Sequence, residues 1–288
     1  MPKPIPILDS GGGLILGGLF LFLLFLQWKW PLRRQHFSVL RRIARNLFFS
    51  APGFALARIS LVPIPILASV WASNHGIGLL HWLPGLPPLV AVPIGVLLMD
   101  YAYWWWHVGL HLIPFLWRFH NVHHSDLDMD VSTATRFHLG EVIFSVPFRV
   151  IVVIAFGIDL WALVVFEMLF ETANFFEHSN WRLPLPLERF LNLILVTPRM
   201  HGIHHSIVQR ETNSNWGTIF SWWDSLHRTL RRDIPQDAIT IGVAAYRDEN
   251  ELTFGRLFVL PFRAPRPWQL PDGNIPERDA RPASELAP

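Results

Sequence analysis

Five long apolar runs, separated by short polar or charged loops, dominate the first two thirds of the chain. Runs of about 20 apolar residues are typical of helices that cross a membrane, whose hydrocarbon core is ~30 Å thick. The last two runs have only about 17 residues each, so we expect them to form a hairpin that enters the membrane and returns. The runs cover residues 14–30, 51–72, 86–106, 140–156 and 160–176. This pattern predicts an all-α fold, a polytopic membrane helical bundle with about four to five membrane helices.

The first run follows a short polar, glycine-rich lead at residues 1–13. A cleaved signal peptide is the alternative interpretation. A retained span is favoured, because positive charge follows the run and no convincing small-residue cleavage site is present. By the positive-inside rule, the basic loop at residues 29–45 is cytoplasmic and the N-terminus lies outside. Residues 35–49 also fit an amphipathic helix lying on the membrane, and Pro63 and Pro65 predict a kink in the second run.

The composition is typical of a membrane protein and limits the kinds of metal site that the chain can form. Hydrophobic residues make up 51% of the chain and charged residues only 16%, a balance typical of membrane proteins. The chain has no cysteine, which excludes disulfides, thiolate zinc sites and cysteine-ligated iron–sulfur clusters. Any metal ion must therefore bind nitrogen and oxygen donors. The net charge of +2 gives no indication of a nucleic-acid partner.

Ten of the 14 histidines are arranged with the spacing of metal ligands. They form an HxxxH pair, two HxxHH motifs and two single positions. The ten are His107, His111, His120, His123, His124, His138, His178, His201, His204 and His205. Ten neutral nitrogen donors are too many for one transition-metal ion but suit two ions with four or five nitrogens each. The remaining four histidines (His36, His75, His81 and His227) are interpreted as interfacial or surface residues.

Helical periodicity predicts how these ligands divide. His107 and His111 are four residues apart and therefore share one helix face. His120 and His124 share a face in the same way, whereas His123 lies beside that face and can reach a second ion. The motif at residues 201–205 offers the same geometry from another part of the chain. A surface histidine cluster is the alternative for a single motif, but it does not account for the complete set.

Several polar residues lie on the same helical stripes as the histidines. Asp100 and Trp104 continue the face of His107 and His111, so Asp100 is a candidate to hold a histidine tautomer. Glu167, Glu171, Asn174 and His178 are spaced by four, three and four residues, and ionisable groups in a spanning segment normally face an interior site. Support of the metal histidines is one interpretation of these acids, and paired contacts between helices are the other. Glu177 either acts similarly or is interfacial.

Counting spans from the basic loop places both histidine-rich segments on the cytoplasmic side. The predicted architecture is therefore a membrane bundle with a cytoplasmic helical cap that holds a dimetal site. We divide the chain into N-terminal spans (1–94), a catalytic region (95–232) and a C-terminal cytoplasmic segment (233–288). Residues 217–230 form an amphipathic piece. The proline-rich, charged residues from 264 onward predict a flexible cytoplasmic tail.

Four segments together resemble the fatty acid hydroxylase and sterol desaturase superfamily of integral-membrane di-iron oxygenases, especially its bacterial members. They read DYAYWWWHVGLH, LWRFHNVHHSDLDMDVSTATRFHLGE, FFEHSN and TPRMHGIHHSIVQRETNSNWGT. The resemblance covers residues 95–230, nearly half the chain. It implies that the ten histidines bind two iron ions, and that dioxygen is the co-substrate for hydroxylation, or in some members desaturation, of a lipid. A bacterial inner membrane is the expected location.

Such chemistry needs electrons, and the sequence shows no haem-binding domain, cysteine cluster or nucleotide fingerprint. We therefore expect a separate ferredoxin- or cytochrome-type donor protein at the cytoplasmic face. Candidate docking charges are Arg199, Arg210, Arg228, Arg231 and Arg232, although plain solvation or lipid-headgroup contact explains them equally well. The expected substrate is a fatty acyl chain, an ether lipid, or a sterol-like or carotenoid-like molecule. A desaturase on the same scaffold and a membrane metal-binding or transport protein are the alternative functions.

Overall fold

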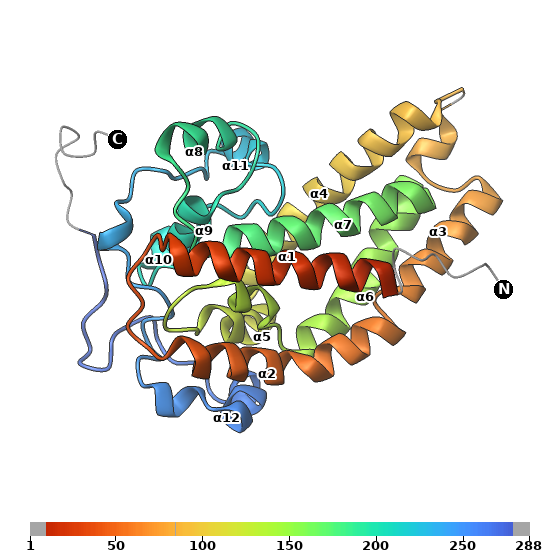
Figure 1. Ribbon diagram of the computed structural model, residues 1–288. Helices are drawn as coiled ribbons and strands as arrows, with labels where there is room; N and C mark the ends of the chain where they lie inside the picture. The colour runs from red at the N-terminus through yellow and green to blue at the C-terminus, as the bar shows by residue number, and fades with distance from the viewer. Residues whose placement is uncertain (1–9, 84, 279–288) are drawn as a thin grey trace.

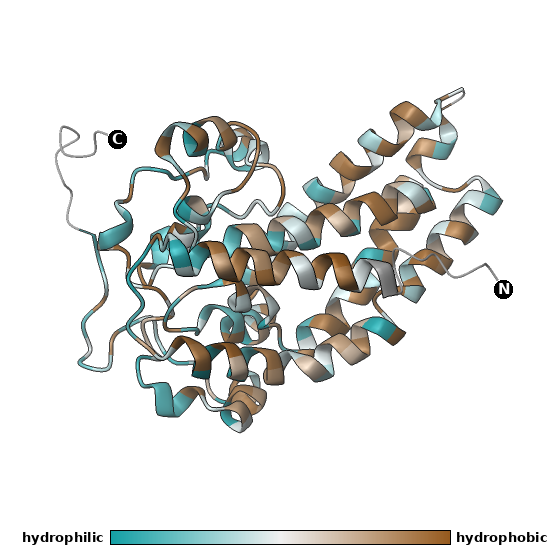
Figure 2. Cartoon of the chain, in the orientation of Figure 1, coloured by the Kyte–Doolittle hydropathy of each residue, from teal (hydrophilic) through white to brown (hydrophobic). Residues whose placement is uncertain are grey.

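The computed structural model describes residues 10–83 and 85–278 and is helical throughout its regular elements. Long helices run together toward one end of the molecule, and short helices gather at the other end (Figure 1). The long helices are α1 (Ser10–Lys29), α2 (Val39–Ile59), α3 (Pro63–His75), α4 (Pro88–Leu112), α6 (Leu139–Phe156) and α7 (Leu160–His178). Figure 2 shows that hydrophobic residues are concentrated on these long helices. The predicted all-α membrane bundle is confirmed.

Within residues 10–83 and 85–278, four segments are long and apolar enough to cross a membrane. They are Gly12–Lys29, Val39–Trp82, Pro88–Leu112 and Leu139–Phe156. The fifth apolar run forms α7, which carries Glu167, Glu171 and Glu177 and packs against α1, α3, α4 and α9. Acidic side chains on a membrane-depth helix require such a protein environment.

The second apolar run is divided differently from the prediction. Residues 35–49 were expected to include a separate interfacial helix, but Val39–Ile59 is one continuous helix, α2. The expected kink is a full break at Ser60–Val62, after which α3 begins at Pro63. Proline lacks a backbone N–H and is favoured at the first position of a helix, so it starts α3 here.

The short helices build the cap that carries the candidate site. They are α5 (Pro114–His124), α8 (Leu185–Leu191), α9 (Pro198–His204), α10 (Gln209–Thr212), α11 (Trp222–His227) and α12 (Phe254–Val259). Short 3₁₀ turns complete it: η2 (Val131–Thr135), η3 (Gln236–Ala238), η4 (Glu249–Leu252) and η5 (Leu260–Phe262). A further 3₁₀ turn, η1 (Leu79–Trp82), lies between α3 and α4. Of the amphipathic piece expected at 217–230, only Trp222–His227 is helical.

The C-terminal segment differs from the flexible tail expected from its composition, as far as residue 278. Trp268 donates its indole N–H to the carbonyl oxygen of Ile207 at 2.7 Å. Arg278 forms a bidentate pair with the buried Glu211, both at 2.8 Å. These contacts hold the segment against the cap. The rest of the tail lies outside the described residues.

The core of the bundle is formed mainly by α4 and α7. Met99 and Tyr103 on α4 and Leu163 and Phe166 on α7 are all buried in one hydrophobic cluster. The rings of Tyr103 and Phe166 meet edge to face with their centroids 4.9 Å apart. This packing fixes the helix that leads into His107 and His111.

Gly78 lies between α3 and the 3₁₀ turn η1, at the end of the bundle away from the cap. Its φ is +111°, and a Cβ atom there would collide with the backbone of Gly157. We expect Gly78→Ala to lower the free energy of unfolding by at least ~2 kcal/mol, because both strain and collision must be relieved. Thermal unfolding in detergent measures this. Gly17→Ala, where a Cβ would meet nothing within 4 Å, is the control, and equal melting temperatures for both variants would contradict the expectation.

Candidate metal centre

Nine of the ten predicted histidines converge into two groups whose ligand atoms lie within 4.8 Å of one another in each group. The first group is His107, His111, His120, His124 and His204. The second group is His123, His178, His201 and His205. Five and four nitrogens match the two-ion division expected from the sequence.

The two HxxHH motifs are shared between the groups in a crossed arrangement. Helix α5 gives His120 and His124 to the first group and His123 to the second. The second motif, on helix α9 and the residue after it, gives one ring to the first group and two rings to the second. His204 joins the first group, and His201 and His205 join the second. In each motif, rings four residues apart share a face and the remaining ring points to the other group. The division predicted for residues 120–124 matches this geometry.

The donor atoms approach closely in a manner that suits a bound cation. In the second group, the Nε2 atoms of His123 and His201 lie 3.0 and 2.9 Å from the Nε2 atom of His178. In the first group, both ring nitrogens of His111 and of His124 are buried with no hydrogen-bond partner in the described structure. Buried polar atoms are nearly always satisfied, so unpartnered nitrogens that face one another indicate a metal site.

Burial keeps the cap histidines neutral, which is the form that binds metal. Burial lowers the pKa of His204 to about 3. Burial, reinforced by the neighbouring histidines, also holds the pKa values of His123, His124, His201 and His205 well below 6.5. At neutral pH these imidazoles therefore offer lone pairs without first losing a proton.

Backbone carbonyl oxygens orient three of the rings. In each case Nδ1–H donates to the carbonyl, which leaves the lone pair of Nε2 available to a metal ion. The pairs are His107 with Trp216 (2.9 Å), His178 with Asn174 (2.7 Å) and His204 with Ser214 (2.8 Å). The segment 214–216 is therefore part of the site. Its sequence did not indicate this, because it contains no side chain of a type that binds metal.

Two carboxylates support further rings, and one of them was missed in the sequence. Glu141 accepts a hydrogen bond from Nδ1 of His120 at 3.0 Å and is itself buried. In the sequence, the only indication of this role was that Glu141 is an acidic residue at the start of an apolar run. Glu177 lies 3.7 Å from Nδ1 of His201 and 3.9 Å from Nδ1 of His178. Support of the metal histidines, one of the two interpretations of Glu177, fits this position.

The expected role of Asp100 was wrong. Its carboxylate accepts hydrogen bonds from the backbone N–H groups of Ile219 (3.3 Å) and Phe220 (3.2 Å) and from the indole of Trp223 (2.7 Å). Asp100 thus holds the loop that follows Trp216 and does not contact a histidine. Helix periodicity placed it on the correct face, but this loop occupies the space beside it.

Glu167 and Glu171 on α7 fit the second of the two interpretations of these acids. Glu167 forms an ion pair with Arg149 on α6, and Glu171 lies beside this pair. These are the paired contacts between helices that were the alternative interpretation. The side chain of Asn174 donates to the carbonyl oxygen of Ala134 at 3.2 Å. Only the backbone of Asn174 supports a metal histidine.

His138 lies outside both histidine groups. Its Nδ1 accepts from the backbone N–H of Gly140 at 2.9 Å, and its Nε2 lies 3.2 Å from the carbonyl oxygen of Phe258. It therefore caps the N-terminus of α6, where a side-chain acceptor satisfies an otherwise free N–H. This use of the ring corrects the ligand assignment of His138.

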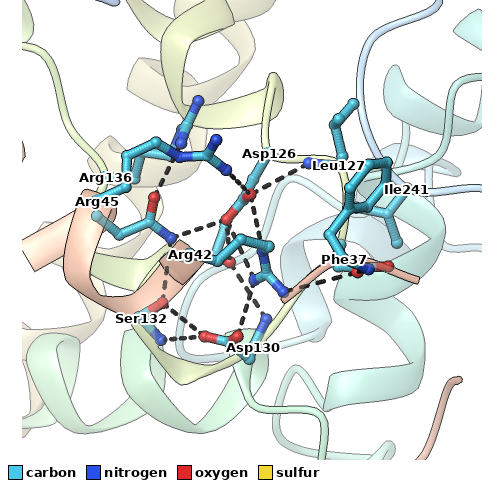
Figure 3. A network of polar contacts seen from close by, with 12 residues as sticks. Phe37, Arg42, Arg45, Asp126, Leu127, Asp130, Ser132, Arg136 and Ile241 are labelled. Atoms are coloured by element: carbon cyan, nitrogen blue, oxygen red, sulfur yellow. Dashed lines mark hydrogen bonds and ion pairs between the residues drawn. The ribbon is translucent and has the colours of Figure 1, made fainter. Parts of the chain in front are cut away.

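A buried network of charges fixes the loop that follows the first HxxHH motif. Arg42 on α2 contacts Asp126 (3.0 Å) and Asp130 (2.8 Å), as Figure 3 shows. Arg136 donates to the carbonyl oxygen of Val122 at 2.8 Å and to the hydroxyl of Ser125 at 3.0 Å. The loop and the end of α5 are thereby held against α2, which positions His123 and His124.

A cavity of about 170 Å³ lies against both histidine groups. His107 and His120 of the first group and His123, His178 and His201 of the second group line it. Its other walls are mainly apolar and come mostly from α2, α4, α6 and α7. They include Phe54, Ala57, Trp106, Leu110, Val142 and Phe170. An apolar molecule in this cavity lies next to both groups.

The chain is similar to lipid-modifying enzymes of known families. Residues 92–229 match the fatty acid hydroxylase family. The ornithine lipid hydroxylase of Rhizobium tropici is 28% identical over 163 residues, which are 56% of this chain and 48% of that protein. The human alkylglycerol monooxygenase is 28% identical over 137 residues, 47% of this chain and 29% of that protein.

The cholesterol 25-hydroxylase of Rattus norvegicus is 26% identical over 183 residues, 62% of this chain and 59% of that protein. This chain thus spans about half the length of the bacterial relative and less than a third of the human one. No solved structure matches it. The resemblance seen in the histidine motifs is confirmed, because residues 92–229 match the fatty acid hydroxylase family and these relatives are hydroxylases or monooxygenases.

Proposed function

We propose that the protein is an integral-membrane di-iron oxygenase that hydroxylates a C–H bond of a lipid. The observation that carries this proposal is that both histidine groups open onto one apolar cavity. Neutral imidazole nitrogens suit iron, zinc and copper, and oxidation of an unactivated C–H bond needs a redox-active ion. Two iron ions therefore fit the donor set and the chemistry.

When bound, the iron ions supply the activation of dioxygen. One oxygen atom enters the C–H bond and the other leaves as water, with two electrons and two protons taken from outside. The histidines fix the position of each ion, and Glu141 and the carbonyl oxygens of Trp216, Asn174 and Ser214 fix the histidine rings. The apolar walls exclude water from the reacting carbon and align the substrate chain.

Relatives that are named for ornithine lipid, alkylglycerol and cholesterol support a lipid substrate. A fatty acyl, ether or sterol-like lipid fits the apolar walls. The basic loop at 29–45 supports an orientation with the metal centre and C-terminus in the cytoplasm, in a bacterial inner membrane.

Mass spectrometry of lipid extracts from cells with and without the protein tests this function. A lipid that gains one oxygen atom is the expected result. A lipid that loses two hydrogen atoms would instead identify a desaturase. Metal flux into proteoliposomes, with no oxidised lipid, would favour the transport alternative.

We further propose that an acidic electron-donor protein docks over the first histidine group. Arg210, Arg228, Arg231 and Arg232 line one surface depression together with Ser214. The carbonyl oxygen of Ser214 accepts the hydrogen bond from His204, so the depression is one residue away from a metal-ligand candidate. Arg199, the fifth candidate docking charge, does not line this depression and pairs instead with Glu188 at 2.6 Å.

Charge reversal in this depression, Arg228→Glu with Arg232→Glu, should lower the donor-supported rate about tenfold or more at low ionic strength. The reason is that steering between opposite charges raises association rates and is screened by salt. Stopped-flow oxidation of a reduced ferredoxin measures the effect. Arg182→Glu with Arg189→Glu is the control with the same charge change on exposed residues elsewhere. Equal losses in both double variants would contradict the docking site.

A further inference from the structure

A cluster of polar side chains lies in the wall of the apolar cavity, away from the histidines. Tyr103 on α4, Arg149 on α6 and Glu171 on α7 all line the cavity. Tyr103 and Arg149 are each only 5% exposed. Ionisable groups at membrane depth are costly and normally serve a site. We call these three residues the cavity cluster.

Two hydrogen-bond donors of the cavity cluster have no partner. The hydroxyl of Tyr103 and the Nε–H group of Arg149 are buried and unbonded in the described structure. Leaving such a donor unsatisfied costs ~1–3 kcal/mol. Both donors are also held in place by stacking. The guanidinium carbon of Arg149 lies 5.0 Å from the ring centroid of Tyr103 and 5.8 Å from the ring centroid of Phe170. Donors that are held in place and have no partner can each donate a hydrogen bond to an oxygen atom of a bound ligand.

The charges of the cavity cluster indicate whether a ligand with an anionic or a neutral oxygen group binds there. Arg149 is already paired with Glu167, and Glu171 adds a second carboxyl group beside one guanidinium. The cluster therefore has no surplus positive charge with which to bind an anionic headgroup. It offers two donors and one carboxyl acceptor, which match a neutral hydroxyl group that both accepts and donates.

Helix geometry gives the separation between the cavity cluster and the metal centre. Arg149 follows Glu141 by eight residues on α6 and Glu171 precedes His178 by seven on α7. At 1.5 Å per residue these spacings are about 12 Å and about 10 Å. Tyr103 lies one turn, about 6 Å, before His107. A hydroxyl bound between the three residues is thus separated from the metal centre by several carbon atoms of apolar cavity.

We propose that the cavity cluster binds the hydroxyl group of a lipid alcohol and so determines which carbon reaches the metal centre. This inference rests on the proposed lipid hydroxylase function and specifies its substrate class. The spacings along the three helices place the oxidised carbon roughly 6–12 Å from the bound hydroxyl. Neither a plain hydrocarbon nor an anionic fatty acid satisfies the cluster.

Binding in the absence of turnover tests the proposal. Tritiated hexadecanol and tritiated hexadecane are titrated against the purified full chain in detergent, under anaerobic and non-reducing conditions. Wild-type protein should bind the alcohol about tenfold more tightly than the alkane, the effect expected of a buried hydrogen bond. Tyr103→Phe, which removes only the hydroxyl, should lose most of this preference and bind the alkane as before. Glu171→Gln should weaken alcohol binding in the same direction.

Tyr101→Phe is the matched control, because Tyr101 lies on the same helix but directs its hydroxyl to His227 at 3.1 Å. It should retain the wild-type preference. Equal affinity of wild type for the alcohol and the alkane would overturn the proposal, and so would an unchanged preference in Tyr103→Phe. Because no reaction is needed, this result is independent of whether the protein hydroxylates lipids. Conversely, an inactive protein that still prefers the alcohol would count against the proposed function alone.

Discussion

Alanine in place of His123 or His204 is expected to abolish lipid oxidation. His123 supplies one of the four donors of the second group, and His204 one of the five donors of the first. Since residues that only support metal ligands contribute 10–100-fold, we expect loss of a ligand to lower activity by more than ~100-fold. Each variant should also lose about one metal ion per chain. Elemental analysis and product mass spectrometry measure the two effects.

His138→Ala is the informative control for these variants. His138 caps α6 and lies outside both histidine groups, so this variant should keep both metal ions. It is expected to lose only the ~1 kcal/mol typical of a helix cap. Full oxidation activity in either His123→Ala or His204→Ala would contradict the ligand assignment. Loss of one ion in His138→Ala would restore that residue to the metal centre.

Removal of Asp126 is expected to destabilise the whole cap. Asp126 is fully buried and contacts Arg42 at 3.0 Å and Arg45 at 3.5 Å. Asp126→Ala removes the carboxylate that lies beside Arg42, Arg45 and Arg136 and leaves Asp130 as the close partner of Arg42 alone. The buried network then has an excess of positive charge, and breaking a buried ion pair in this way costs ~3–5 kcal/mol in comparable sites. Thermal unfolding in detergent should show a melting temperature far below that of the exposed control Asp237→Ala. A similar melting temperature for the two variants would show that the network does not stabilise the fold.

The network also predicts the pH dependence of stability. Burial alone would raise the pKa of Asp126, but Arg42 and Arg136 outweigh it and hold the pKa below its usual value. A carboxyl group with a lowered folded-state pKa stabilises the protein at every pH above its unfolded value of about 4. This contribution is lost only as the pH falls further. Asp126→Ala should therefore reduce stability equally at pH 6 and pH 8.

The division of the first HxxHH motif between two histidine groups followed from the sequence because it depends on local geometry. Residues three and four apart on a helix share a face whatever surrounds them. The placement of His120 and His124 in one group and of His123 in the other needed nothing else. Likewise, the length and apolarity of the runs were enough to predict the membrane bundle.

The contacts of Asp100 and His138 could not be read from local spacing. Their partners, the 219–223 loop and Phe258, lie about 120 residues away in the chain. Glu141 was missed for the same reason, because its partner His120 belongs to a different helix. Helical periodicity tells which face a side chain occupies. It does not tell which distant segment covers that face.

The metal content of the purified protein tests the account most directly. Two histidine groups predict about two iron ions per chain, and reduction of this protein under oxygen should add one oxygen atom to a lipid. Folded protein that contains only zinc, and that remains inactive after it is loaded with iron, would contradict the account.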